Sequence, residues 1–132
     1  MIGLDTNVLV RYLVQDDAAQ ARAASHLIET RCTNEDPGFV SLLVLAELVW
    51  VLDRGYGYTR SQVAGALNGI LTAAELKVEQ PDLARNALID YGNGPADFAG
   101  YLIGHVNAAC GCGTTATFDK RTMKSSLHSL LR

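Results

Sequence analysis

The chain opens with MIGLDTNVLVRYLVQDD, Met1 to Asp17, and this stretch predicts how the fold begins. The apolar residues 2–4 are typical of a short buried strand, and the apolar pattern that follows residue 7 is typical of a helix. Asp5 stands between the two, at the carboxyl end of the strand, where open α/β sheets place their ligand crevices. Two interpretations are open here, because Asp5, Thr6 and Asn7 are also favoured helix caps.

Length and composition indicate one globular domain over residues 1–132, with 48% hydrophobic and 19% charged residues. The net charge of -3 means that a nucleic-acid role would need a local basic patch. The longest nearly apolar run, residues 39–52, is shorter than the ~20 residues of a membrane span. No secretory signal is recognisable, and the three cysteines show neither a disulfide framework nor zinc spacing. We therefore expect a reduced, cytoplasmic protein without a membrane partner.

Helical and strand patterns alternate along the rest of the chain. Helices are expected at residues 16–31, at 42–54, from 59 on, from 81 on and at 96–109, and strands at 39–40, 76–79 and 114–118. The helix 42–54 is apolar almost all round, which predicts a central place in the core. A partly helical, basic tail is expected to close the chain. Strands separated by helices imply an α/β fold with a parallel sheet that is covered on both faces.

Three further acids attract attention beside Asp5. Glu47 has only apolar neighbours three and four residues away on its predicted helix, so we expect a buried carboxylate that needs a partner. A distant Arg or Lys would satisfy Glu47 as well as a metal ion would. Asp97 at a helix start and Asp119 at a strand end each have an ordinary structural explanation when taken singly.

Taken together, the four acids indicate a metal site. The predicted topology brings them to one edge of the sheet, where carboxylates repel each other unless a hard divalent cation joins them. Without the cation, this repulsion is expected to raise the pKa of at least one of them. Oxygen ligands favour magnesium or manganese over zinc, and such a site activates water for attack on a phosphodiester.

A basic segment follows the last of these acids. It contains Lys120, Arg121 and Lys124. Two interpretations are open: contact with a nucleic-acid backbone, or an ordinary solvated surface.

Four short motifs resemble, in order, those of the PIN-domain family. They are Ile2-Gly3-Leu4-Asp5-Thr6-Asn7-Val8-Leu9, Ser41-Leu42-Leu43-Val44-Leu45-Ala46-Glu47-Leu48, Ala96-Asp97-Phe98-Ala99 and Thr117-Phe118-Asp119. The set spans nearly the whole chain, and its order is specific although no single motif is. Within the family, the chain most resembles the VapC-type toxins of bacterial toxin–antitoxin pairs.

This resemblance implies a three-layer α/β/α sandwich with a central parallel sheet and a metal-dependent endoribonuclease activity that uses Mg²⁺ or Mn²⁺. It also implies an RNA substrate, a homodimer and a small VapB-like antitoxin that blocks the site. The residues that it assigns are Asp5, Glu47, Asp97 and Asp119 as catalytic and metal-binding acids, with Thr6, Asn7 and Thr117 as polar support.

Two alternatives remain open. A phosphatase of the haloacid-dehalogenase kind also places an Asp after its first strand, although it usually carries a second Asp where this chain has Asn7. An interaction module whose acids merely cap helices would bind no metal and would leave Glu47 unexplained.

Two glycines interrupt the predicted helix 96–109. Gly100 and Gly104 should each weaken it by ~1 kcal/mol relative to alanine. We expect close packing against a neighbouring element to explain both.

Overall fold

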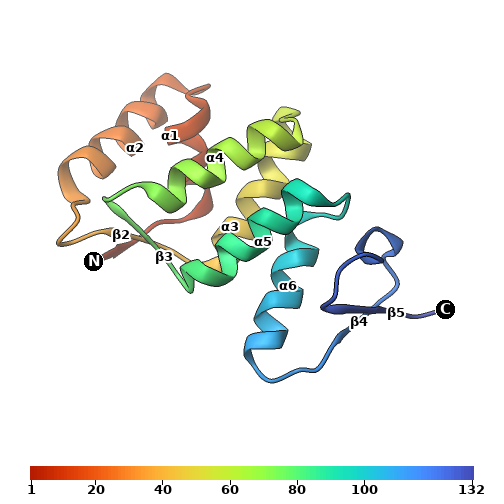
Figure 1. Cartoon of the computed structure of the whole chain (residues 1–132). Helices are drawn as coiled ribbons and strands as arrows, with labels where there is room; N and C mark the ends of the chain where they lie inside the picture. Colours follow the sequence, from red (N-terminus) through yellow and green to blue (C-terminus); the bar gives the residue numbers. More distant parts are fainter. The chain divides into compact units, whose positions relative to one another are not determined.

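The computed structural model describes all 132 residues and confirms the α/β class (Figure 1). Parallel strands alternate with six α-helices, which is consistent with the predicted three-layer α/β/α fold. The elements are β1 (Ile2–Gly3), α1 (Thr6–Val14), α2 (Ala18–Arg31), β2 (Gly38–Val40), α3 (Leu42–Trp50), the π-helical turn η1 (Val51–Gly55), α4 (Arg60–Thr72), β3 (Leu76–Val78), α5 (Pro81–Asn93), α6 (Phe98–Ala109), β4 (Thr115–Thr117), the 3-10 turn η2 (Lys120–Thr122) and β5 (His128–Leu130). None of the helices has the length and apolarity that a membrane crossing demands.

The chain divides into two compact parts. We call them the N-terminal part (Met1–Pro81) and the C-terminal part (Asp82–Arg132). The N-terminal part contains a three-stranded parallel sheet in the order β1-β2-β3, with Ile2 opposite Gly38 and Gly38 opposite Leu76. Because the strands are parallel, their carboxyl ends share one edge, and α1 and α3 both begin there.

The starts of α2, α3 and α4 are fixed by side chains that cap them. The Asp17 carboxylate accepts the Gln20 amide at 3.0 Å, and the Ser41 hydroxyl accepts the Val44 amide at 3.1 Å. Thr59 forms a capping box: its hydroxyl accepts the Gln62 amide, and its own amide donates to the Gln62 side chain. Each such cap stabilises its helix by about 1 kcal/mol, because it satisfies an amide that the helix leaves unpaired.

Helix α3 is less enclosed than predicted. Leu45 and Leu48 are fully buried, but Leu43 is 80% exposed and Trp50 is 64% exposed. Leu43, Glu47 and Trp50 follow each other at spacings of four and three residues, so they share one exposed face of the helix. The prediction of a helix that is buried almost all round was therefore wrong, because apolarity on every side does not ensure a partner on every side.

The C-terminal part contains a second, two-stranded parallel sheet. Strand β4 pairs with β5, with Thr115 opposite His128 and Thr117 opposite Leu130. The sequence analysis assigned β5 to a partly helical tail and placed the strand 114–118 in the central sheet. Both assignments were wrong for these two strands, although the tail is partly helical at the 3-10 turn η2. Strand β5 is too short for its periodicity to be recognised, and the partner of β4 depends on contacts that a local pattern does not show.

His128 anchors β5 on α6. Its Nε2 lies 3.0 Å from the carbonyl oxygen of Gly100, and its Nδ1 lies 2.7 Å from the Ser125 hydroxyl. A Cβ at Gly104 would lie 2.6 Å from Cε1 of the His128 ring, whereas a Cβ at Gly100 would meet nothing within 4 Å. Close packing therefore explains Gly104, but the same expectation for Gly100 was wrong.

Candidate active site

Asp97 occupies the N-cap position of α6 without acting as a side-chain cap. Its backbone is extended, with φ -67° and ψ 149°, and its carboxylate accepts no capping hydrogen bond from the helix. The side chain is 56% exposed. The helix dipole favours an acid at this position, but it does not determine the direction of the Asp97 oxygens.

Asp119 follows β4 and is held by two threonines. Its amide donates to the Thr117 hydroxyl at 3.0 Å, and its carbonyl accepts from the Thr122 hydroxyl at 2.7 Å. Its Oδ1 accepts the backbone amide of Arg121 at 2.9 Å, which begins the turn η2. Thr117 was predicted as a supporting residue, but Thr122, only 2% exposed, was missed. Its position three residues after an aspartate at a turn was the available signal.

Arg121 bridges these two acids. Its Nε and Nη2 donate to the two oxygens of Asp119, both at 2.9 Å. Its Nη1 and Nη2 donate to the two oxygens of Asp97 at 3.3 and 3.2 Å. One guanidinium is thus bonded to two carboxylates that lie 22 residues apart in the sequence (119 minus 97). Arg121 was predicted as an RNA contact, and here its charge is directed at the acids.

The bridged pair has the donor chemistry of a site for a small hard cation. Both carboxylates already converge on one positive group, and carboxylate oxygens are the ligands that Mg²⁺ prefers. Mg²⁺ is commonly held by one or two carboxylates together with water. In neither part do three or more His, Cys, Asp or Glu side chains gather around one position. The residues present therefore fit a cation that is held by two protein carboxylates.

The pKa of Asp119 shifts in the direction opposite to the one that repulsion between acids would cause. The side-chain hydrogen bonds from Arg121, followed by its backbone amide, hold the pKa of Asp119 below its ordinary value. The same contacts with Asp119 and Asp97 raise the pKa of Arg121. A cation from the same chain therefore supplies the charge compensation, and the expected rise in pKa does not occur at Asp119.

Asp5 and Thr6 lie at the carboxyl end of β1. The exposed Asp5 carboxylate accepts the Thr6 amide at 2.8 Å and opens α1. Thr6 is only 2% exposed, and its hydroxyl has no hydrogen-bond partner within the protein. A buried hydroxyl without a partner costs the fold about 1–3 kcal/mol. Asn7 is exposed and lines a groove of about 280 Å³ between α1 and α2.

Glu47 lies in the second turn of α3 and is exposed. The prediction that it is buried was wrong, so the cost of desolvation does not single it out. Asp5 and Glu47 belong to the N-terminal part, whereas Asp97 and Asp119 belong to the C-terminal part. The structure brings the second pair together through Arg121, and the joining of all four acids in one site stays a prediction.

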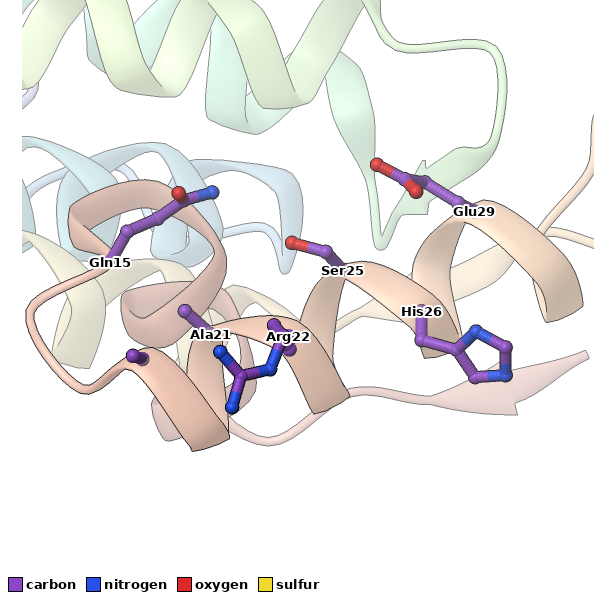
Figure 2. A pocket seen from close by; sticks show the side chains of 7 residues that line it. Gln15, Ala21, Arg22, Ser25, His26 and Glu29 are labelled. Carbon is purple, nitrogen blue, oxygen red and sulfur yellow. The ribbon is translucent and has the colours of Figure 1, made fainter.

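A separate groove of about 540 Å³ runs along α2. Figure 2 shows Ser25, His26 and Glu29 among the side chains that line it. Its lining carries charges of both signs and includes none of the predicted site residues. It is therefore distinct from the candidate site.

Comparison with known proteins identifies the family. A model described as PIN domain matches residues 2–103, which is most of the chain and includes Asp5, Glu47 and Asp97. No curated protein and no solved structure gave a significant match. The family match disfavours the haloacid-dehalogenase alternative. The chain therefore belongs to the PIN-domain family, whose members are generally metal-dependent nucleases.

Proposed function

We propose that this protein is an endoribonuclease that hydrolyses RNA phosphodiester bonds with Mg²⁺ or Mn²⁺. The observation that carries the proposal is the convergence of Asp97 and Asp119 on one cationic group, in a chain of the PIN-domain family. Asp97 and Asp119 would hold the cation, and Asp5 and Glu47 would complete the acidic set. When bound, the cation would lower the pKa of a water molecule and offset negative charge on the phosphate oxygens.

The surrounding residues support this arrangement in defined ways. Thr117 and Thr122 hold the backbone of Asp119, so its oxygens need little reorganisation to receive a cation. The Thr6 hydroxyl offers an unused polar group beside Asp5. Lys120 and Lys124 are exposed on the segment after Asp119 and would contact the RNA backbone.

The test is cleavage of a labelled single-stranded RNA with Mg²⁺, with Mn²⁺ and with chelator. Asp97→Asn should lower the metal-dependent rate at least tenfold, because a ligand charge is lost while the shape of the side chain is kept. Asp82→Asn is the matched control, since Asp82 is an acid in the first turn of α5 with a side chain that is 94% exposed. Equal activity in the two variants would contradict the role of Asp97.

The same preparation separates the rival functions. A phosphatase would release phosphate from a generic phosphomonoester, and we expect none. An interaction module would show neither metal-dependent cleavage nor a metal-dependent thermal shift. Release of phosphate from the phosphomonoester would refute the nuclease proposal. So would the absence of both metal-dependent cleavage and a metal-dependent thermal shift.

We further propose that the protein acts in the cytoplasm as the toxin of a toxin–antitoxin pair, as a homodimer that a VapB-like antitoxin inhibits. The support is the resemblance of its ordered motifs to VapC-type toxins. An antitoxin would inhibit most directly by presenting an arginine to the acids, because a guanidinium can bind two carboxylates. Co-expression with the product of an adjacent small reading frame should relieve growth arrest and yield an inactive complex. An isolated complex that cleaves RNA as fast as the free protein would contradict the inhibitory role.

A further inference from the structure

Arg121 combines three features that a purely structural ion pair does not require. It binds two carboxylates rather than one, and both are predicted metal ligands. The contact is accessible to solvent, with side-chain exposures of 50% for Arg121 and 56% for Asp97. The bonds to Asp97, at 3.2 and 3.3 Å, are longer than those to Asp119, at 2.9 Å. The guanidinium thus occupies the position of a cation in a contact that solvent can reach.

Asp119 would keep its place if the guanidinium left. Its Oδ1 is also bonded to the backbone amide of Arg121, and its own backbone is held by Thr117 and Thr122. None of these bonds involves the guanidinium. The backbone of Asp97 is placed by the start of α6, where its carbonyl accepts the Tyr101 amide, whereas its exposed carboxylate is bonded to Arg121. Asp119 therefore offers a fixed carboxylate to either cation, and the guanidinium draws the Asp97 carboxylate to it.

We propose that Arg121 is a built-in counter-ion, which holds Asp97 and Asp119 together in the metal-free protein and competes with the divalent cation for them. This inference rests on the proposed metal-dependent function. In the exchange the guanidinium would give up its four hydrogen bonds to Asp97 and Asp119, and these two carboxylates would be the groups that hold the divalent cation. Arg121 is a positioning residue in this scheme, because it acts through the acids.

The test is the affinity for Mn²⁺, measured from the electron paramagnetic resonance signal of the free ion. Arg121→Gln should bind Mn²⁺ about three- to thirtyfold more tightly than the wild type, which lies within the range that the loss of two exposed ion pairs gives. Lys120→Gln is the matched control, because it removes the same charge from the neighbouring exposed residue and should change the affinity by about twofold or less. The Mn²⁺ affinity of Arg121→Lys should lie between those of the wild type and Arg121→Gln, since an ammonium keeps the charge but cannot make the bidentate contacts.

A second readout follows the guanidinium itself. The Nε–H resonance of Arg121 should shift on addition of Mg²⁺, because its bond to Asp119 is released. In Asp119→Asn the chemical shift of this Nε–H should already be close to the value that the wild type reaches with Mg²⁺. Addition of Mg²⁺ should then change it little. A merely structural ion pair would leave the wild-type resonance in place while Mg²⁺ binds elsewhere.

The outcomes separate this inference from the function on which it rests. If Mn²⁺ binding is lost in Asp97→Asn but Arg121→Gln binds no more tightly than Lys120→Gln, the counter-ion role is wrong and the metal site stands. If no variant shows binding that depends on Asp97, both the metal site and the counter-ion role are wrong. Tighter binding by Arg121→Gln that is lost on adding Asp97→Asn supports both.

Discussion

The Arg121 bridge lowers the pKa of Asp119, and this has a direct consequence for the pH dependence of stability. The hydrogen bonds from Arg121 hold the folded-state pKa of Asp119 below its ordinary value of 3.8. When folding lowers the pKa of a carboxyl group, the group stabilises the native state at every pH above its pKa in the unfolded chain. This stabilisation is lost as the pH falls through the pKa of the folded state. The contribution is thus complete at neutral pH and disappears only in acid.

Replacement of Arg121 by Gln should therefore return the pKa of Asp119 towards 3.8. The measurement is a titration of the side-chain carboxyl ¹³C shift of Asp119 between pH 2 and pH 6 in both proteins. Lys120→Gln, which leaves the bridge intact, should titrate like the wild type. An unchanged Asp119 titration in Arg121→Gln would mean that the backbone amide alone lowers the pKa.

Two buried threonines offer a second prediction at this scale. Thr6 and Thr122 are both 2% exposed, but the hydroxyl of Thr6 is unpaired and that of Thr122 donates to Asp119 at 2.7 Å. Thr6→Val should be neutral or stabilise the fold by up to about 1–3 kcal/mol, because it removes an unsatisfied polar group. Thr122→Val should destabilise it by about 1 kcal/mol, because the Asp119 carbonyl loses one of its two hydrogen bonds and keeps only the one from the Thr122 amide, at 3.1 Å. Urea unfolding measures both, and a destabilised Thr6→Val would indicate that its hydroxyl has a partner.

At the scale of elements, the packing of β5 on α6 depends on the absence of a side chain at one position. His128 is held by Gly100 and Ser125, so its ring cannot move aside cheaply from a methyl group at Gly104. The two helix glycines therefore differ in role. Gly104 permits the contact through its size, whereas Gly100 contributes a carbonyl that any residue would supply.

Alanine at these two positions should accordingly have opposite effects. Gly104→Ala should destabilise the protein by about 1–3 kcal/mol through overpacking. Gly100→Ala should stabilise it by up to about 1 kcal/mol, because alanine favours the helix and the space is open. Thermal unfolding of the two variants provides the measurement. Addition of His128→Ala should relieve part of the cost at Gly104, and the absence of any relief would show that the ring is not the obstacle.

At the scale of the whole molecule, the central question is whether acids of the two parts serve one cation. A cation that binds only the native state at ten times its dissociation constant adds about 1.4 kcal/mol, which corresponds to roughly 4–6 °C in the melting temperature of a domain of this size. If all four acids share the site, a substitution in either part should abolish the same shift.

Asp5→Asn and Asp97→Asn should therefore each remove most of the rise in melting temperature that Mg²⁺ causes, and the double variant should lose no more than either single one. In chelator, Asp97→Asn should change the stability little, because it loses only an exposed ion pair with Arg121. Asp82→Asn should retain the full shift. A full Mg²⁺ shift in Asp5→Asn would separate the N-terminal acid from the metal site.

Local rules predicted the elements well because their signals lie within a few residues. The caps Asp17, Ser41 and Thr59 begin helices where expected, since each hydroxyl or carboxylate satisfies an amide two or three positions away. The motif around Asp97 pointed in the same way to the start of α6. These features need no knowledge of distant contacts.

The sequence by itself therefore determined the α/β class, the helix starts and the candidate acids. Only the tertiary structure decided that β4 pairs with β5, that Glu47 is exposed and that Arg121 joins Asp97 to Asp119. The physical reason is that each of these depends on contacts between segments distant in the chain. Helix periodicity does not show which apolar face lacks a neighbour, and a basic residue near an acid does not show which carboxylates it will bind.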